Sequence, residues 1–528
     1  MSVRGSVIAA TETSERLGGG GAIAAGGQLT FADGGILGNA QVGLAALLPG
    51  TIVRVEDTEI SETFGDVRLG GGYGIQASVG ANVTARRCLL AGNTASGVVA
   101  DGDGTQVDLV DAEIRDTRAN EDGTGGRGIS AEAGATVSVA GCSIMGNHQA
   151  GVWAIDPGTR VMLAETAISD TAPNRAPGQG YGVQVANGAV LSANACRLSR
   201  NTEVGVEAAG VGTTVTLADT DIWDTNARAV GDHGRGIDAQ AGASVTVVRG
   251  SIGRNYEAGV AAGGLGTTVD LTDTQVVDTR RSSATALALG VQAHTGAAIR
   301  ITGGAVSRTA GMGVFVTNAV GELDRVVVRG NSFSGVTLIS GALSIENCAI
   351  NENVRDREWG GGMGVYAEEI VGLPLELSLA DSTIGPHAYA AIWLDGAGRY
   401  DIEGNDLSGS EGITLSGRRA HGNAIFAQNG AAVWDGASGL LLRRNMFSDA
   451  ENIAVLLHDA SAAFDSNRWE NNAVDLRQQR CGEDISLVTD EDLAGVPTVV
   501  ESCPNGPQTI IDESLQFTSL YLSEADPL

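Results

Sequence analysis

A compact run of carboxylate and hydroxyl side chains occurs at residues 213–225, which read TTVTLADTDIWDT. Such a run beside a tryptophan could form a catalytic or metal-binding site. Closely similar strings recur at residues 106–117, 160–171 and 267–279, so the run is one copy of a periodic feature. We interpret its Asp and Thr residues as strand-end and turn residues, because Asp bonds nearby backbone donors and Thr suits a stacked strand.

Paired carboxylates are the second candidate for chemistry. Inverting hydrolysis of a glycosidic bond needs two carboxyl groups about 6.5 to 9.5 Å apart. Four candidates in the second half would lie on adjacent turns of a coil, namely Asp395, Asp401, Asp435 and Asp459. The chain holds 63 acidic residues, so proximity of this kind arises readily by chance. The pattern therefore assigns no catalytic residue.

Motifs for metals and activated nucleophiles are missing from the sequence. None of the six His residues shares a metal-ligand spacing such as HxxxH. The sequence contains no GxSxG, no phosphate-binding loop and no dinucleotide fingerprint. We expect no metal site and no cofactor, with calcium left open.

The elements that position these side chains follow from a 54-residue repeat. One glycine series has this period and precedes aliphatic residues: Gly43, Gly97, Gly151, Gly205, Gly259 and Gly313. A second glycine series, beginning at Gly74, splits each unit into a 23-residue coil and a 31-residue coil. Asn39, Asn93, Asn147, Asn201 and Asn255 form a further column. Fixed periods of this kind indicate a solenoid.

The shorter coil has too few residues for a pair of helices and suits three short strands with turns. The longer coil carries a polar, Gly-rich stretch that we expect to project as a loop at every second turn. The GV-x-A, V-x-I and S-I-x-x-N patterns resemble the right-handed parallel β-helix, or pectate-lyase-like, superfold. The resemblance covers almost all of residues 1–480. It implies an all-β solenoid, and function stays open because this superfold hosts lyases, hydrolases, epimerases, adhesins and structural rods.

The sequence predicts three regions and roughly nineteen coils. Residues 1–312 form the regular 54-residue repeats, residues 313–480 form less regular coils, and residues 481–528 form a capping tail. The coils of the second region are expected to start near Gly313, Gly335, Gly364, Ala391, Gly412, Ala432, Ile453 and Ala473.

The cysteines fit the same repeat. Cys88, Cys142, Cys196 and Cys348 each lie five residues before an Asn, and the first three are two coils apart. Bridged cysteines need Cα atoms within about 7 Å, so we expect unpaired, buried side chains. Cys481 and Cys503 flank the irregular tail and are a candidate disulfide, which would favour an exported protein.

Composition restricts the partners. The formal charge of −30 argues against nucleic acid and anionic membranes, and no apolar run is long enough to span a bilayer. All 33 basic residues are Arg, which indicates a GC-rich bacterial source. RLGGG at 16–20 recurs at 68–72, so residue 1 falls inside a repeat. We expect an earlier true start, which would also explain the missing signal peptide, and an uncapped first coil able to self-associate.

Outward positions of the Gly-aliphatic strands are the candidate contact face, because side chains of a strand alternate. The first-half column is mostly polar: Gln76, Val99, Ser130, Trp153, Gln184, Glu207, Asp238, Ala261 and Gln292. After residue 312 it becomes Phe315, Thr337, Tyr366, Trp393, Thr414 and Trp434. The hypothesis is that Phe315, Tyr366, Trp393 and Trp434 form an exposed platform for sugar rings. The alternative is that loops at 353–363 and 418–430 bury these rings.

Three functions remain open at this stage. The first is a secreted or cell-surface structural β-helix that binds glycan without catalysis. The second is a divergent polysaccharide lyase or glycoside hydrolase. The third is a phage-derived or self-associating fibre.

Overall fold

The computed structural model describes residues 1–12, 20–66, 70–174, 179–229, 231, 233–283, 287–356, 360–410, 413–415, 418–420, 422–428, 438–451, 453–480 and 498–502. Every regular element in these ranges is a β-strand. They contain no helix long and apolar enough to cross a membrane. Contacts divide the chain into unit 1, which is Met1–Gln275 with Ser282–Ala286, and unit 2, which is Val276–Arg281 with Leu287–Leu528.

Unit 1 is a stack of coils in which each complete coil contributes three strands, one to each of three parallel ladders. The first ladder contains β3 (Ala22–Ala25), β6 (Val42–Leu47), β11 (Tyr73–Ser78), β14 (Ser96–Asp101), β17 (Arg127–Glu132), β20 (Gln149–Ile155), β23 (Gly180–Ala186), β26 (Val204–Ala209), β29 (Arg235–Gln240) and β32 (Ala258–Gly263). The second contains β1 (Ser2–Arg4), β4 (Gln28–Ala32), β7 (Ile52–Glu56), β12 (Asn82–Arg86), β15 (Gln106–Val110), β18 (Thr136–Ala140), β21 (Arg160–Ala164), β24 (Val190–Asn194), β27 (Thr214–Ala218), β30 (Ser244–Val248) and β33 (Thr268–Thr272).

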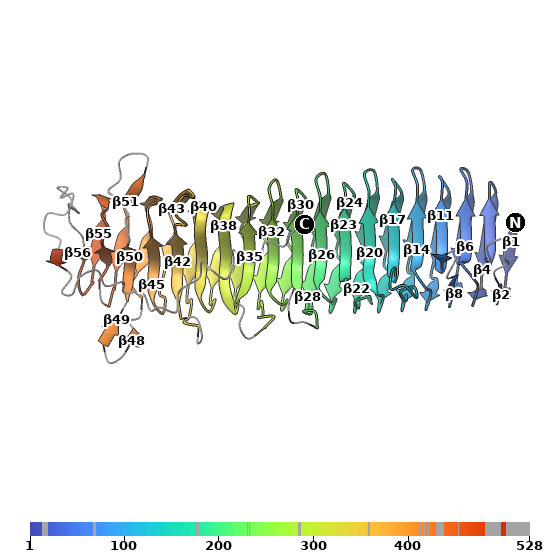
Figure 1. Cartoon of the computed structure of the whole chain (residues 1–528), viewed down its shortest axis with the longest axis horizontal. Coiled ribbons are helices and arrows are strands. Elements are labelled where there is room, and N and C mark those ends of the chain that lie inside the picture. The colour runs from blue at the N-terminus through green and yellow to red at the C-terminus, as the bar shows by residue number, and fades with distance from the viewer. Residues whose placement is uncertain are drawn as a thin grey trace. The chain divides into compact units, whose positions relative to one another are not determined.

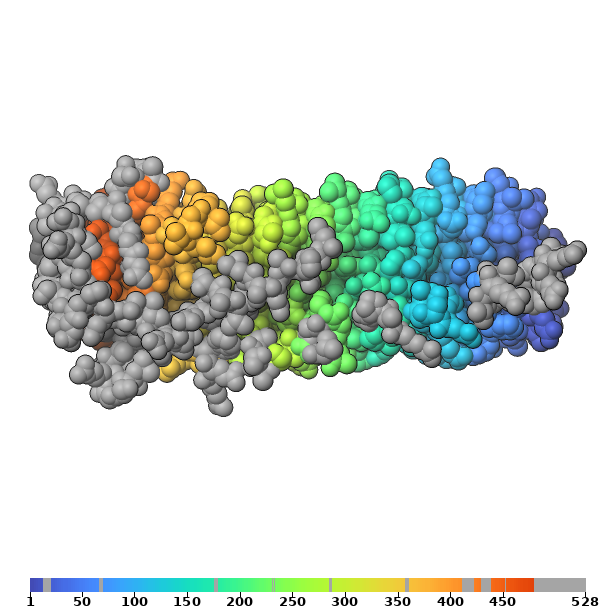
Figure 2. All heavy atoms as spheres, in the orientation of Figure 1, coloured from blue at the N-terminus to red at the C-terminus, as the bar shows by residue number. Residues whose placement is uncertain are grey.

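The third ladder contains the shortest strands. They are β2 (Val7–Ala9), β5 (Gly35–Leu37), β8 (Glu59–Ser61), β13 (Leu89–Ala91), β16 (Glu113–Arg115), β19 (Ser143–Met145), β22 (Ala167–Ser169), β25 (Arg197–Ser199), β28 (Asp221–Trp223), β31 (Ser251–Gly253) and β34 (Gln275–Val277). A small antiparallel pair, β9 (Gly65–Asp66) and β10 (Gly70–Gly71), lies in one of the longer coils. Figure 1 shows β20, β23 and β26 side by side, and on the face in view of Figure 2 the described coils of unit 1 are closely packed.

Register confirms that one 54-residue repeat spans two coils. Ile75 pairs with Val98 across the shorter coil, and Val98 pairs with Ile129 across the longer one. The three inward side chains are fully buried, at 0 % exposure. Alternating burial along each strand therefore places the core inside the coil.

The glycine before each inward aliphatic residue has a steric cause. A Cβ atom on Gly128 would lie 2.6 Å from the Gly151 carbonyl oxygen and 2.8 Å from Ile144 Cγ2. Neighbouring coils approach too closely at this point for any side chain. The glycine columns found in the sequence thus mark close backbone approach.

The asparagine column satisfies the buried backbone of the turns. Asn93 Oδ1 accepts a hydrogen bond from the Thr63 N–H of the preceding coil at 3.1 Å, and its Nδ2 donates to the Ile60 carbonyl at 3.1 Å. Asn147 does the same with the Thr117 N–H and the Ile114 carbonyl. The side chains are fully buried, so each amide replaces water as a partner for two backbone groups.

The acidic column is architectural, as the repeat predicts. Its members Asp57, Asp111, Glu165, Asp219 and Asp273 all adopt positive φ, between 47° and 52°. Asp57 forms a bidentate pair with Arg87, and Asp219 one with Arg249, in each case on the next coil. These residues build turns and exposed inter-coil ion pairs.

The four repeat cysteines are free and buried, which confirms the expectation that they fill space. Cys142 Sγ also accepts the Ala112 N–H at 3.3 Å, and Cys348 Sγ accepts the Val326 N–H at 3.4 Å. The sulfur atom therefore accepts a hydrogen bond from a backbone N–H of the preceding coil.

Unit 2 keeps the three ladders. The first contains β35 (Ala288–His294), β42 (Met363–Glu368), β45 (Ala390–Asp395), β50 (Asn423–Gln428), β53 (Val455–His458), β56 (Leu476–Arg480) and β57 (Thr498–Ser502). The second contains β36 (Ala298–Thr302), β43 (Leu375–Ala380), β46 (Arg399–Glu403), β51 (Gly439–Arg443) and β54 (Ala463–Asp465). The third contains β37 (Ala305–Ser307), β39 (Val327–Arg329), β41 (Ala349–Asn351), β44 (Thr383–Ile384), β47 (Asp406–Ser408), β52 (Met446–Ser448) and β55 (Arg468–Glu470). Two long strands, β38 (Gly311–Asp324) and β40 (Ser334–Glu346), run through both the first and the second ladder.

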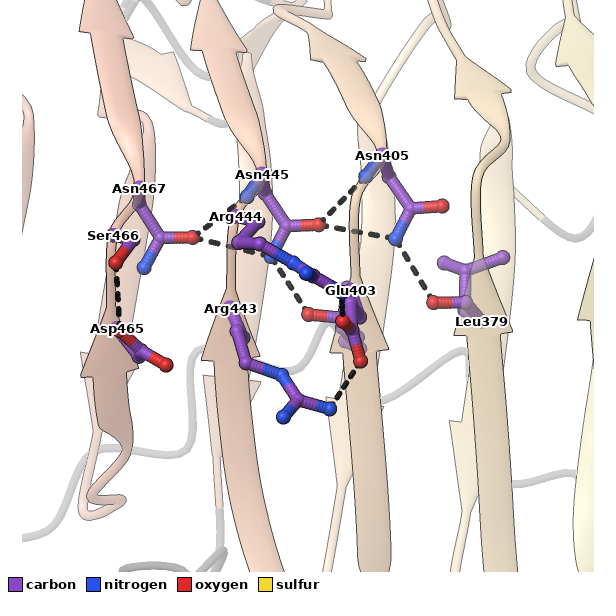
Figure 3. Close-up of polar contacts among 10 residues, drawn as sticks. Leu379, Glu403, Asn405, Arg443, Arg444, Asn445, Asp465, Ser466 and Asn467 are labelled. Carbon is purple, nitrogen blue, oxygen red and sulfur yellow. Dashed lines mark hydrogen bonds and ion pairs between the residues drawn. The ribbon is translucent and has the colours of Figure 1, made fainter.

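A second asparagine ladder occupies the position that cysteine fills earlier in the chain. Asn405 N donates to Asn445 Oδ1 at 3.0 Å, and Asn445 N donates to Asn467 Oδ1 at 2.9 Å. Figure 3 shows the three amides in register, with Glu403 between Arg443 and Arg444. This polar cluster joins successive turns and is structural.

The predicted coil starts at Gly412 and Ala432 lie outside the described residues, and the register of the described strands around them differs from the prediction. Trp393 on β45 pairs with Phe426 on β50, so the next first-ladder strand lies between the two expected starts. The segment before it contains an antiparallel hairpin of β48 (Ile413–Leu415) and β49 (Arg418–Ala420). One strand replaces two, which gives eighteen third-ladder strands where about nineteen coils were expected. Trp434, Cys481 and Cys503 lie outside the described residues, as does almost all of the capping tail.

Candidate ligand-binding face

The three described members of the expected aromatic platform are not exposed, and the fourth, Trp434, lies outside the described residues. Phe315, Tyr366 and Trp393 are only 1 %, 5 % and 1 % exposed. Trp393 stacks on Tyr389 with ring centroids 5.1 Å apart, and it meets Phe426 edge-on at 4.7 Å. These side chains point outward from the first ladder and are nevertheless buried. The outward position of a residue in a strand therefore does not by itself predict that its side chain is exposed.

The acidic candidates of the second half do not form one site. Asp395 lies on first-ladder strand β45 and accepts a hydrogen bond from Gln428 Nε2 at 2.7 Å. Asp401 lies on second-ladder strand β46, which belongs to a different face. Asp459 follows β53 with a positive φ of 47°, and Asp435 lies outside the described residues.

Unit 1 carries a concentrated polar cluster on the outward face of the first ladder, which we call the β23–β29 cluster. Parallel register places Trp153, Gln184, Glu207 and Asp238 in one row on β20, β23, β26 and β29. Adjacent strands are about 4.8 Å apart. The row therefore presents an aromatic ring followed by an amide and two carboxyl groups.

Two arginines neutralise most of the surrounding carboxylates. Arg235 bonds Asp238 at 3.0 Å and Glu257 Oε1 at 2.5 Å. Arg228 lies 3.5 Å from Glu203, and the His233 N–H donates to Glu257 at 2.5 Å. These contacts fasten the segment around residues 228–234 onto the outward face. Glu257 and Arg235 remain about one-fifth exposed.

Glu207 differs from the other carboxyl groups. It is 7 % exposed, its Oε2 atom has no hydrogen-bond partner, and Gln240 Nε2 lies at 3.4 Å from its Oε1. Burial, followed by the neighbouring charge of Asp238, raises the pKa of Glu207 to about 8. The side chain is therefore mainly protonated at neutral pH and can donate a hydrogen bond or a proton.

The neighbours of Glu207 also have unused polar atoms. Gln184 is 8 % exposed, and its Oε1 atom has no partner. Trp153 is half-buried with an unpartnered Nε1–H, and the Arg127 guanidinium lies 3.8 Å from the ring centroid. Three adjacent strands thus hold three polar atoms without a hydrogen-bond partner: Trp153 Nε1–H is a donor, Gln184 Oε1 is an acceptor, and Glu207 Oε2 is a donor when it carries the proton.

Metal chemistry finds no support in the described ranges. They contain no group of three or more His, Cys, Asp or Glu side chains placed to hold a metal ion. The close Arg235 pairing explains why this acidic cluster does not form a cation cage.

Comparison with known proteins agrees with this architecture. Residues 127–304 match the family model described as "Right handed beta helix region". The chain has the fold of a right-handed parallel β-helix. This confirms the fold expected from the sequence, and the matched segment contains the whole β23–β29 cluster.

Solved structures are similar at low identity. Pectate lyase Pel9A has 12 % identity and a TM-score of 0.27, with 64 % of this chain and 70 % of that chain covered. A chain of the Vag8–C1 inhibitor complex has 12 % identity and a TM-score of 0.36, covering 95 % and 100 %. The Streptococcus pneumoniae surface protein and adhesin PfbA has 10 % identity and a TM-score of 0.31, covering 82 % and 92 %. No curated protein sequence matches the chain.

Proposed function

We propose that this chain is an extracellular or cell-surface β-helix protein that binds polysaccharide on the β23–β29 cluster. One observation carries the proposal: Trp153, Gln184 and Glu207 hold adjacent unpartnered polar atoms beside an aromatic ring. Buried polar groups in a folded protein are normally satisfied. A hydroxyl group both donates and accepts, so a ligand rich in hydroxyl groups could donate to Gln184 and accept from Trp153 and protonated Glu207.

Charge selects the class of polysaccharide. With Glu207 protonated, the cluster holds four carboxylates, on Glu132, Glu203, Asp238 and Glu257, against three guanidinium groups, on Arg127, Arg228 and Arg235. The whole chain is also strongly acidic, at −30. Like charges repel across a binding face. Uncharged glycans are therefore favoured over polyuronides.

Binding is tested with the full chain by affinity electrophoresis in xylan, mannan and a β-glucan, with alginate and polygalacturonate as acidic probes. We expect retardation by at least one neutral glycan. Gln184→Met removes the free acceptor at similar volume and should weaken binding about tenfold, as loss of about 1.4 kcal/mol would do.

Gln76→Met is the matched control, because Gln76 occupies the same outward column on β11. It should bind like the wild type. The proposal fails if no neutral glycan retards the protein, or if the two variants lose binding equally.

A further inference from the structure

We infer that the β23–β29 cluster also cleaves the glycosidic bond of its neutral glycan, with Glu207 as general acid and Asp238 as nucleophile. The inference rests on the proposed binding function. Glu207 and Asp238 are direct register partners on β26 and β29. Their environments differ in the way that such a reaction requires, because only one of the two carboxyl groups has a cationic partner.

The pairing of Asp238 sets its role. The Arg235 guanidinium contacts Asp238 Oδ2 at 3.0 Å and is itself fixed by Glu257. An arginine at this distance forms a charge-assisted hydrogen bond that orients the Asp238 carboxylate, and a carboxylate oxygen is the atom that would attack an anomeric carbon. Asp238 is 6 % exposed, so bulk water does not screen its charge.

The lack of a cationic partner suits Glu207 to the role of general acid. Its Oε2 atom is buried without a hydrogen-bond partner, and the groups around the side chain are Asp238, Glu203, Tyr181, Gln184 and Gln240, of which none is cationic. Two acidic neighbours disfavour a second negative charge in the same place. A protonated carboxyl group beside an anionic one is the arrangement that divides acid and nucleophile in glycoside cleavage.

The atoms and charges of the reaction balance without a cofactor. In the first step an Asp238 oxygen bonds the anomeric carbon, the bond to the leaving oxygen breaks, and the Glu207 proton passes to that oxygen. In the second step Glu207 takes a proton from water. The water oxygen bonds the anomeric carbon and releases Asp238. Water is the only co-substrate.

Strand spacing predicts the stereochemistry. Register partners on adjacent strands have backbones about 4.8 Å apart, and their side chains leave the sheet on the same face, so the two carboxyl groups start from this spacing. Retaining enzymes hold their carboxyl groups about 5 to 5.5 Å apart, whereas inverting enzymes need about 6.5 to 9.5 Å. The pair therefore predicts retention of the anomeric configuration.

The test measures binding and cleavage on the same full-length samples. Each glycan that retards the wild type is incubated with it while reducing ends, ultraviolet absorbance and the product anomer by proton NMR are followed. We expect reducing ends without an unsaturated product, and the retained anomer. Glu207→Gln and Asp238→Asn should each lower kcat/KM by at least about 100-fold.

Controls separate the outcomes. Gln76→Met, in the same outward column on β11 and away from both carboxyl groups, should keep cleavage within a few-fold of the wild type. A 2-fluoro glycoside of the bound sugar should add its glycosyl mass to the wild type and not to Asp238→Asn. Retardation without reducing ends would overturn cleavage and leave the binding proposal standing. An inverted anomer or an unsaturated product would overturn this assignment of roles.

Discussion

At the residue scale, identity and environment separate side chains that look alike in the sequence. Asp219 and Asp238 are both acidic residues of the repeat region. Asp219 is an exposed turn residue with φ of 47° that pairs with Arg249. Asp238 is buried beside a carboxyl group that has no counter-ion. Position relative to the coil surface, rather than residue type, decides which one can act on a ligand.

Glu207 should make the stability of unit 1 depend on pH. Its folded pKa of about 8 lies above the ordinary value of 4.5, so the folded state binds more protons between these limits. Stability is therefore fully present below pH 4.5 and is lost as pH rises toward 8, by up to about 1.4 kcal/mol per pH unit. Urea unfolding of wild type and Glu207→Gln at pH 5 and pH 8 checks this.

Glu207→Gln lacks the titrating group, so its free energy of unfolding should increase relative to that of the wild type as pH rises. A difference between the two proteins that stays constant from pH 5 to pH 8 would contradict the burial of Glu207.

At the element scale, the ladders could be predicted from the sequence because their causes are local and periodic. The Gly128 contact and the Asn93 amide recur in each repeat, so the pattern reveals the strands and the 54-residue, two-coil unit. The coil that follows Ala391 could not be placed, because the β48–β49 hairpin interrupts the period, whereas the starts expected near Ile453 and Ala473 lie close to β53 and β56. An aliphatic residue such as Ile413 looks the same in a hairpin as in a ladder.

The candidate site was only partly visible for a similar reason. The outward row of Trp153, Gln184, Glu207 and Asp238 follows from strand alternation. Arg235 and Glu257 lie just before the inward-pointing aliphatic residues of β29 and β32. Nothing local in the sequence indicates that their side chains meet on the outward face of the first ladder. The available signal was two acidic residues at the same outward position of adjacent coils. The burial of Phe315 and Trp393 depends on packing between distant segments, which no periodic pattern encodes.

His387 gives a prediction for the ladder of unit 2. It occupies the position after Asn353 in the asparagine column, and the Asn353 N–H donates to His387 Nδ1 at 3.4 Å. Burial lowers the pKa of His387 from 6.5 to about 3. The stability contributed by the neutral ring is present above pH 6.5 and is lost as pH falls toward 3.

Replacement by the residue usual in this column should remove that sensitivity. His387→Asn can still accept the Asn353 N–H, so it should unfold at a higher urea concentration than the wild type at pH 4. At pH 7.5 the two midpoints should be close. Parallel losses in both proteins between these pH values would mean that the ring is not responsible.

At the scale of the whole molecule, unit 1 behaves as a stack in which each coil contacts its neighbours. Solenoid stability is approximately a sum over repeats and their interfaces. The register of all three ladders returns with each 54-residue repeat, because short and long coils alternate. The repeat, rather than the single coil or an arbitrary length, is therefore the unit that can be removed.

Deletion of residues 74–127 tests this. The change joins Tyr73 to Gly128, so that Tyr73 takes the place of Arg127, and it keeps Gln184, Glu207 and Asp238. We expect a folded protein with an unchanged β-sheet signal by circular dichroism and a thermal midpoint within a few degrees of the wild type. Deletion of residues 74–100, about half as long, fuses Tyr73 to the end of β14 and shifts every later strand out of register, so it should unfold. If the two deletions destabilised the protein equally, the 54-residue repeat would not be the removable unit. Keeping the register of the ladders would then give the longer deletion no advantage over the shorter one.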